Sequence, residues 1–147
     1  MIDVKFKKIS DKVVLPRLAH DTDACMDVIA ISKSWLHEHN CWEYSLGFST
    51  GIPEGYKGVI VPRSSISKYD LIMCNSPAQI DSQYIGPWKV RFKETQPKII
   101  SGNIKIYNVG DKIAQIFFEP ILPMTFSEVV ELEDSERGSG GFGSTGK

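Results

Sequence analysis

The chain has 147 residues, with 17 Lys or Arg against 18 Asp or Glu and a formal net charge of -1. This length suits one domain that buries a sizeable core, and the balanced charge argues against a bulk nucleic-acid partner. Its 3 cysteines are odd in number and irregularly spaced, which predicts free thiols rather than a disulfide framework. Residues 1–8 lack the apolar core of a signal peptide, and no apolar run has the length of a membrane span. We therefore expect a cytoplasmic protein that binds neither membranes nor nucleic acid.

Short apolar stretches between turn residues predict an all-β fold. Residues 2–9 alternate apolar and polar side chains, as a half-buried strand does. Further stretches with strand composition are 24–31, 44–48, 58–61, 89–92, 104–107, 113–118 and 125–132. Short helical turns are expected around residues 34–39 and 64–71. A series of short strands without a long amphipathic helix predicts an antiparallel β-barrel or jelly roll. We expect a single β domain over residues 1–136, followed by a Gly-rich C-terminal arm over residues 137–147.

The arm has the composition of a phosphate-binding segment. Residues 137–146 read Arg-Gly-Ser-Gly-Gly-Phe-Gly-Ser-Thr-Gly. Glycines let backbone N–H groups approach an anion closely, and Arg137 supplies a guanidinium suited to phosphate oxygens. The ring of Phe142 could lie on a nucleobase. The alternative interpretation is a flexible polar tail, which Gly/Ser-rich ends often are.

Polar groups that could bind an anion also occur in two stretches of the predicted strands. Asp27 ends the stretch Asp-Ala-Cys-Met-Asp that begins at residue 23, and it could orient a neighbour or hold a metal-bound water. Residues 62–65, Pro-Arg-Ser-Ser, present a cation and two hydroxyls at the start of a helical turn. The alternatives are an ordinary turn residue and an ordinary helix cap.

Two later stretches carry a candidate base and a candidate polar site residue. Residues 75–84 have turn chemistry at both ends, which predicts a hairpin whose backbone could contact a base edge. Asp81 in this stretch could take a proton from water, and Tyr84 offers a ring. Residues 110–116 predict a turn that leads into a buried strand, with Gln115 as a polar group able to face a site. A solvent-facing Asp and a satisfied core Gln are the alternatives.

These five stretches, in this order, closely resemble the five ordered motifs of the trimeric dUTPases. The matching segments are Ala-x-x-Asp at 24–27, Pro-Arg-Ser-Ser at 62–65, Ile-Asp-x-x-Tyr at 80–84, Gly-Asp-x-Ile-Ala-Gln at 110–115 and the Gly-rich arm at 137–146. The resemblance implies a β jelly-roll homotrimer with a C-terminal arm, in which each site is built by all three subunits. It implies Mg²⁺-dependent hydrolysis of dUTP to dUMP and pyrophosphate, which supplies dUMP and limits uracil in DNA.

The resemblance also assigns roles to individual residues. Asp81 is the expected general base that activates the attacking water, and Asp27 is expected to contact Mg²⁺ through a water. The expected phosphate-binding residues are Arg63, Ser64, Ser65, Gln115, Arg137, Gly141, Ser144 and Thr145. The expected uracil and deoxyribose residues are Asn75, Ala78, Ile80, Tyr84 and Phe142, with Tyr84 beneath the sugar and Phe142 on the uracil.

Several positions depart from the family pattern. Cys25 and Met26 replace the usual Gly-Tyr, and Ala78 replaces a Gly, so Ala78 needs an ordinary φ. Gln83, Ile85 and Pro87 also differ from the expected residue types, and residues 93–102 resemble an insertion.

His37, His39 and Cys41 suggest zinc only weakly, because no fourth ligand is near in the sequence. Two alternatives remain open: a dCTP deaminase of the same superfamily, and a binding or regulatory protein switched by the nucleotide.

Overall fold

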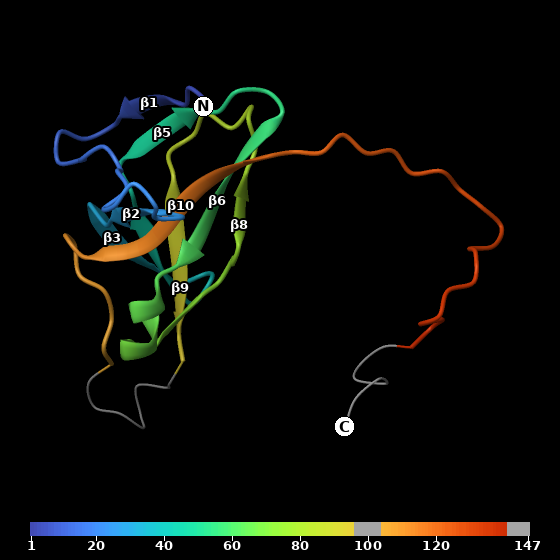
Figure 1. The fold of residues 1–147 in the computed structure, drawn as a ribbon. Helices are drawn as coiled ribbons and strands as arrows, with labels where there is room; N and C mark the ends of the chain where they lie inside the picture. Colours follow the sequence, from blue (N-terminus) through green and yellow to red (C-terminus); the bar gives the residue numbers. More distant parts are fainter. Residues whose placement is uncertain (96–103, 141–147) are drawn as a thin grey trace.

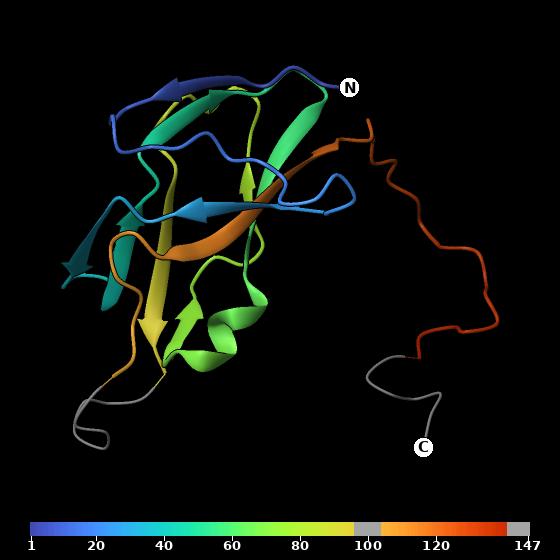
Figure 2. The ribbon, with the colours of Figure 1, turned by 60° about the vertical axis from the view of Figure 1, so that its left-hand side comes forward.

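Antiparallel pairing joins all the strands that the structure contains. The computed structural model describes residues 1–95 and 104–140, and this part holds ten strands and one short 3₁₀ helix, η1 (Ser64–Lys68). One sheet pairs β1 (Lys5–Lys8) with β5 (Phe48–Gly51). A second has the order β2 (Met26–Ile29), β10 (Lys112–Pro120), β6 (Tyr56–Pro62), β8 (Ala78–Ile80). The third has the order β3 (Ser32–Leu36), β4 (Cys41–Ser45), β9 (Lys89–Glu94), β7 (Leu71–Met73). Figures 1 and 2 show the strands wrapping around a common interior, so the jelly-roll prediction is confirmed.

The core lies between the inner faces of the two four-stranded sheets. In β9, Val90 and Phe92 are buried while Lys89 and Arg91 between them are exposed, as alternation in a half-buried strand requires. Trp88, immediately before β9, has 0% of its surface exposed and packs on Phe48 with ring centroids 5.4 Å apart. Aromatic rings therefore fill much of the interior at the end of β9, where they bury a large apolar area.

Most of the predicted strands are present, but three predictions of strands or helical turns before residue 121 differ from the structure. Residues 34–39 do not form a helical turn, because Ser32–Leu36 is β3 and pairs with β4. Residues 104–107 form no strand, although Tyr107 is buried in the core. Residues 44–48 are not one strand but the end of β4 and the start of β5, with Gly47 turning the chain between them at a φ of +72°. The predicted helical turn after residue 64 is present as η1.

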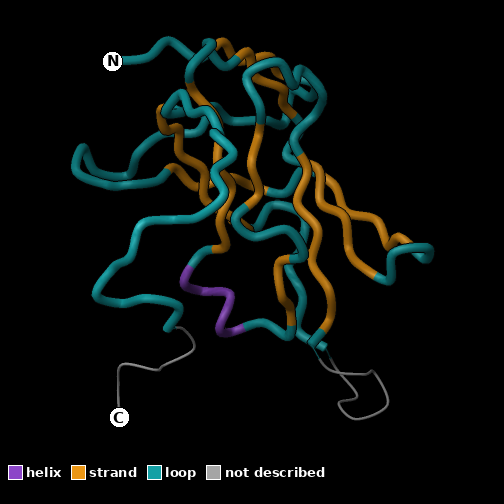
Figure 3. Tube along the Cα trace, turned by 90° about the vertical axis from the view of Figure 1, so that its right-hand side faces the viewer, coloured by secondary structure: helices purple, strands orange, loops and turns teal. Residues whose placement is uncertain are grey.

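Beyond β10 the chain leaves the body as an extended arm, which Figures 1 and 3 show standing away from the sheets. Residues 121–140 form no strand, and nearly all are exposed. The predicted strand over 125–132 is therefore wrong for the single chain, because an extended segment needs a neighbouring strand to form a ladder. The departure begins at residue 121, before the expected boundary at 137. Within the residues that the structure describes, no helix is long and apolar enough to cross a membrane.

Candidate active site

The first, second and fourth motifs meet at one end of the sheet β2-β10-β6. Asp27 of β2 lies opposite Gln115 of β10, so both side chains occupy the same face of the sheet. Arg63 directly follows β6, which pairs with the other side of β10. Its Nε donates to Oδ1 of Asp27 at 2.7 Å, and its Nη2 donates to Oδ2 at 3.4 Å. Strand pairing thus brings together three residues that are far apart in the sequence.

Lys112 joins this cluster because of a β-bulge. Its Nζ lies 3.0 Å from Oδ2 of Asp27. In a regular strand Lys112 and Gln115 would point to opposite faces, since they are three residues apart. The register of β10 on β2 shifts between Lys112 and Ala114, and this extra residue puts both side chains on the same face. Alternation in the sequence does not reveal the bulge, so Lys112 is a site residue that the sequence analysis missed.

The electrostatics of Asp27 follow from these two cations. Burial alone would raise the pKa of the Asp27 carboxyl, but hydrogen bonds from Lys112 and Arg63, with their positive charges, outweigh it. The pKa of Asp27 is therefore lower than usual, and the carboxylate is ionised at neutral pH. Arg63 also donates from Nη1 to Oγ of Ser65 at 3.2 Å. The guanidinium thus ties Ser65 of η1 to the carboxylate, while Ser64 remains exposed.

A polar hollow of about 400 Å³ opens beside this cluster. Its lining includes Arg17, Asp23, Asp27, Lys112 and Gln115. Arg17 is a second residue that the sequence analysis missed, and no motif signals it. A pocket with several cations and amide or carboxylate groups at its wall can hold a hydrated polyanion such as a phosphate chain.

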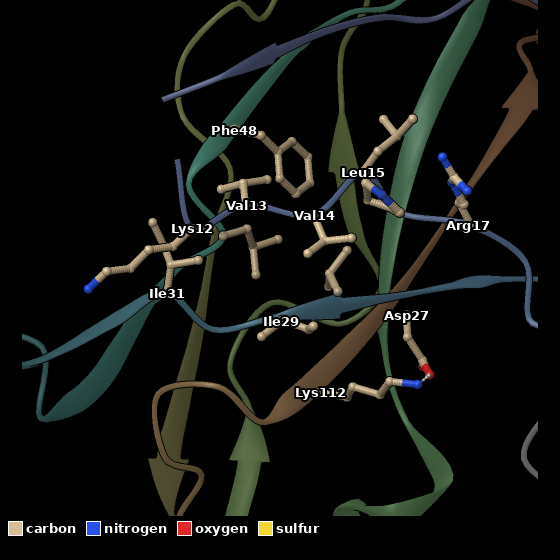
Figure 4. A pocket seen from close by; sticks show the side chains of 13 residues that line it. Lys12, Val13, Val14, Leu15, Arg17, Asp27, Ile29, Ile31, Phe48 and Lys112 are labelled. Carbon is tan, nitrogen blue, oxygen red and sulfur yellow. Dashed lines mark ion pairs between the residues drawn. The ribbon is translucent and has the colours of Figure 1, made fainter. Parts of the chain in front are cut away.

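An apolar hollow of about 200 Å³ lies on the other side of Asp27. Figure 4 shows Asp27 and Lys112 at one end of it and Val13, Ile29 and Ile31 toward the other. Of the residues predicted for the site, only Asp27 lines this hollow. We therefore treat it as a neighbour of the polar cluster and not as part of the site.

The third motif lines a separate hollow, also of about 400 Å³. All of Asn75, Ala78, Ile80 and Tyr84 contribute to it, together with buried Trp88. The hairpin prediction is only partly right. β8 pairs with β6 of one sheet, whereas the flanking strands β7 and β9 pair with each other in another sheet. The motif therefore bridges the two sheets, and this arrangement forms the hollow.

The replacement of Gly by Ala at position 78 causes no backbone strain. Ala78 begins β8 opposite Ile60, and Asn40 is the one non-glycine residue with a positive φ in the described part of the chain. The expectation of an ordinary φ at Ala78 is confirmed. Its small side chain is 6% exposed, packs in the core and also lines the third-motif hollow.

Asp81 and Tyr84 lie on the turn that follows β8. Both are exposed, and the backbone N–H of Tyr84 donates to the carbonyl oxygen of Asp81 at 3.0 Å. The Tyr84 hydroxyl donates to the carbonyl oxygen of Pro87 at 3.0 Å. An exposed carboxylate next to a pocket can accept a proton from water, which is what a general base requires.

The polar hollow and the third-motif hollow have no lining residue in common. Residues expected to bind phosphate and residues expected to bind a nucleoside thus lie in two separate places on one chain. Arg137 lies apart from both, on the arm, where its Nε donates to the carbonyl oxygen of Gly140 at 3.1 Å. Gly141, Phe142, Ser144 and Thr145 lie outside the described residues, as does most of the predicted insertion at 93–102.

The suggestion of zinc near residue 37 gains no support. His37 and His39 are exposed at the β3–β4 turn, whereas Cys41 is buried at the start of β4. Across residues 1–95 and 104–140, no three His, Cys, Asp or Glu side chains gather into a possible metal site. Cys25, Cys41 and Cys74 are all free thiols, as the sequence analysis predicted.

Comparisons with known proteins agree on one family. The dUTPase family model matches residues 11–146. The chain is 34% identical over 146 residues to the deoxyuridine 5′-triphosphate nucleotidohydrolase of Thermobifida fusca, covering 99% of this chain and 79% of that protein. It is 33% identical over 149 residues to the protein of that name in Clostridium acetobutylicum, covering 99% and 98%. The fold matches a Staphylococcus bacteriophage 80alpha dUTPase solved with dUpNHpp, with a TM-score of 0.77, 25% identity and 99% coverage of both chains.

Proposed function

This chain belongs to the dUTPase family, and we propose that it hydrolyses dUTP to dUMP and pyrophosphate at a site shared between subunits. The reaction supplies dUMP and limits the entry of uracil into DNA. One observation supports this assignment of the site: Asp27 and Gln115 line the polar hollow, and Asn75, Ala78, Ile80 and Tyr84 line the third-motif hollow.

Asp81 is the general base of this proposal. Its exposed carboxylate follows β8, directly after pocket residue Ile80. Asp81 and Tyr84 lie on the same turn, in which the backbone N–H of Tyr84 donates to the carbonyl oxygen of Asp81 at 3.0 Å. A nucleotide whose sugar lies on Tyr84 would therefore bring its α-phosphate toward Asp81. Asp81 then takes a proton from a water that attacks the α-phosphorus, with pyrophosphate as the leaving group. Positioned bases of this kind contribute about 10²–10⁴-fold to a rate.

The residues around Asp27 bind and orient the phosphate chain. Arg63 is already paired with Asp27, so it mainly fixes the turn that carries Ser64 and Ser65, while Lys112 and Gln115 face the polar hollow. Phosphoryl transfer needs little covalent help from a protein, and its catalysis rests on positioning and on stabilising charge. Arg137 and the Gly-rich arm, with Gly141, Ser144 and Thr145, complete this set, and Phe142 stacks on the uracil.

The residues at this site fit magnesium that arrives with the substrate. Both oxygens of Asp27 are occupied by cations, so this carboxylate suits contact with a metal-bound water better than direct coordination. Mg²⁺ keeps several of its waters and is commonly held by phosphates with few carboxylates. When bound, the ion would neutralise charge on the triphosphate and help to orient it.

A homotrimer explains why the single chain has separate half-sites. In the arm, Leu122, Met124, Phe126, Val130 and Leu132 are 73–101% exposed, and their spacing would put them on one face if the arm paired as a strand. Such a face needs a partner surface, and a second copy of the chain provides one without a further protein. We propose that three copies exchange arms, so that each site combines one subunit's Asp27 cluster, another's Tyr84 pocket and the arm of the third.

The substrate assignment is tested by pyrophosphate release from dUTP, dCTP, dTTP and UTP, each with Mg²⁺. We expect turnover of dUTP alone, because Tyr84 lines the third-motif hollow and is expected to lie beneath the deoxyribose. Ammonia released from dCTP would instead support the deaminase. Binding of dUTP without turnover of any nucleotide would support a nucleotide-switched regulatory protein.

A further inference from the structure

Gly86 lies directly behind the ring of Tyr84. A Cβ atom at Gly86 would lie 2.7 Å from both Cζ and the hydroxyl oxygen of Tyr84, and 3.0 Å from Cε2. Real Cβ atoms essentially never approach other heavy atoms more closely than 3.0 Å. The φ of Gly86 is not in the left-handed region, so the backbone there does not itself require glycine. What requires glycine is the space that the ring occupies.

Two hydrogen bonds hold the Tyr84 ring back against this glycine. The hydroxyl donates to the carbonyl oxygen of Pro87, and the backbone N–H donates to the carbonyl oxygen of Asp81, each at 3.0 Å. The ring is thus folded across its own turn, and its hydroxyl donor is used within the chain. Tyr84 lines the third-motif hollow, whereas Gly86 is not among the residues that line it.

We propose that Gly86 is a positioning residue that sets the depth of the Tyr84 ring and thereby the choice of deoxyribose over ribose. The inference rests on the proposed function and deepens it. An alanine at position 86 would push the ring toward the hollow by on the order of 0.5–1 Å, enough to restore ordinary carbon contacts. The atoms in the way belong to the end of a side chain that is 43% exposed, so the ring moves and the fold survives.

A displaced ring has a distinct kinetic consequence. The ring that is pushed toward the hollow takes up space that the deoxyribose needs, whereas a ribose, which the native site already rejects, has little left to lose. Gly86→Ala should therefore raise the KM for dUTP more than it lowers kcat. We expect the ratio of kcat/KM for dUTP to kcat/KM for UTP to fall at least about fivefold, within the range for one hydrogen-bonding group.

A double-mutant cycle separates this role from a general effect on the turn. In a Tyr84→Ala background there is no ring to displace, so Gly86→Ala should change kcat/KM for dUTP by less than about twofold further. Ile85→Ala is the matched control, because Ile85 lies in the same turn with 79% of its surface exposed. This control should leave the dUTP-to-UTP ratio within about twofold of the wild type.

The experiment measures pyrophosphate release from dUTP and UTP for the wild type, the three single variants and the double variant. Reduced selectivity in Gly86→Ala, absent from Ile85→Ala and not additive with Tyr84→Ala, supports the proposal. Unchanged selectivity in Gly86→Ala, or full additivity with Tyr84→Ala, overturns the role of Gly86. In that case, turnover of dUTP by the wild type still upholds the proposed function. A wild type without any preference for dUTP overturns both.

Discussion

The Nε atom of Arg63 lies 2.7 Å from Oδ1 of Asp27, and this contact joins the turn after β6 to the middle of β2. The side chains of the two residues are 27% and 20% exposed, so the pair is partly shielded from water. Lys112 reaches the other carboxylate oxygen from β10. One carboxylate thus links three neighbouring strands at the end of the sheet that is expected to face the phosphates.

Replacing Asp27 with Asn should weaken both the fold and phosphate binding. The variant leaves Arg63 and Lys112 without their anion. We expect the free energy of unfolding to fall by about 1–2 kcal/mol. This is the low end for hydrogen bonds to charged groups, because the cluster is partly solvated. Urea unfolding at a fixed protein concentration measures it. Asp21→Asn, a change at an exposed neighbour, should have no measurable effect.

The ion pair of Asp27 with Arg63 also predicts how the loss of stability in Asp27→Asn depends on pH. The pKa of Asp27 is lower in the folded chain than its ordinary value of about 3.9. Its contribution to stability is therefore complete above that ordinary value, and it is lost as the pH falls through the lower folded pKa. The gap in unfolding free energy between the wild type and Asp27→Asn should stay constant from neutral pH to about 5 and close below about 4. A gap that widened on acidification would contradict the assignment.

Asp81→Asn should remove the base and little else. We expect kcat for dUTP to fall by about 10²–10⁴-fold, while the exposed position of the side chain leaves the fold intact. Stopped-flow pyrophosphate detection measures the rate, and titration with the non-hydrolysable analogue dUpNHpp measures binding. An unchanged kcat would mean that another group activates the water.

The strands that the sequence predicted have either an apolar-polar alternation, as β1 does, or a strand-like composition, as β6 and β9 do. β3 was missed because Ser32, Lys33 and Ser34 have little strand propensity, and the segment is held by pairing with β4 instead. β7 and β8 have three residues each, too short for a periodic pattern, and their pairing partners are distant in sequence. Local composition cannot report a tertiary partner of this kind.

The residues of the site were predictable to the extent that motifs mark them. The resemblance identified Asp27, Gln115 and Tyr84, which the structure places at two hollows. It did not identify Lys112, whose direction depends on a bulge, or Arg17, which reaches the hollow through the fold alone. The role of Gly86 was also hidden, because the sequence gives no sign that a ring folds back over it.

Gly58→Ala should be among the most destabilising single changes in the core. A Cβ at Gly58 would lie 2.7 Å from Cη2 of Trp88, whose buried ring packs on Phe48 and Phe118. Overpacking of this kind costs about 1–3 kcal/mol, which a shift of the urea midpoint would report. Gly51→Ala is the matched control, since its Cβ would approach Lys5 no closer than 3.3 Å. An equal loss of unfolding free energy in both variants would argue against a clash with Trp88 as the cause.

Truncation separates the two parts of the arm. A chain ending at Glu136 keeps the apolar residues of the arm and loses the Gly-rich segment, so it should stay trimeric while kcat/KM falls by at least about 100-fold. A chain ending at Pro120 also loses the apolar face that includes Phe126 and Leu132, and it should no longer form trimers. Light scattering measures the mass of each. A trimer that survives truncation at Pro120 would contradict arm exchange.

Mixing two inactive variants tests whether each site is assembled from different subunits. Asp81→Asn supplies an intact arm, and the chain ending at Glu136 supplies an intact Asp81. If the base and the arm of one site come from different subunits, random trimers from an equal mixture should recover about one quarter of the wild-type activity, because each of the two positions is correctly filled half of the time. If both came from the same subunit, every site would lack one of them and no activity would return. Dissociation in urea, refolding together and a dUTP assay distinguish these outcomes, with each variant refolded alone as the control.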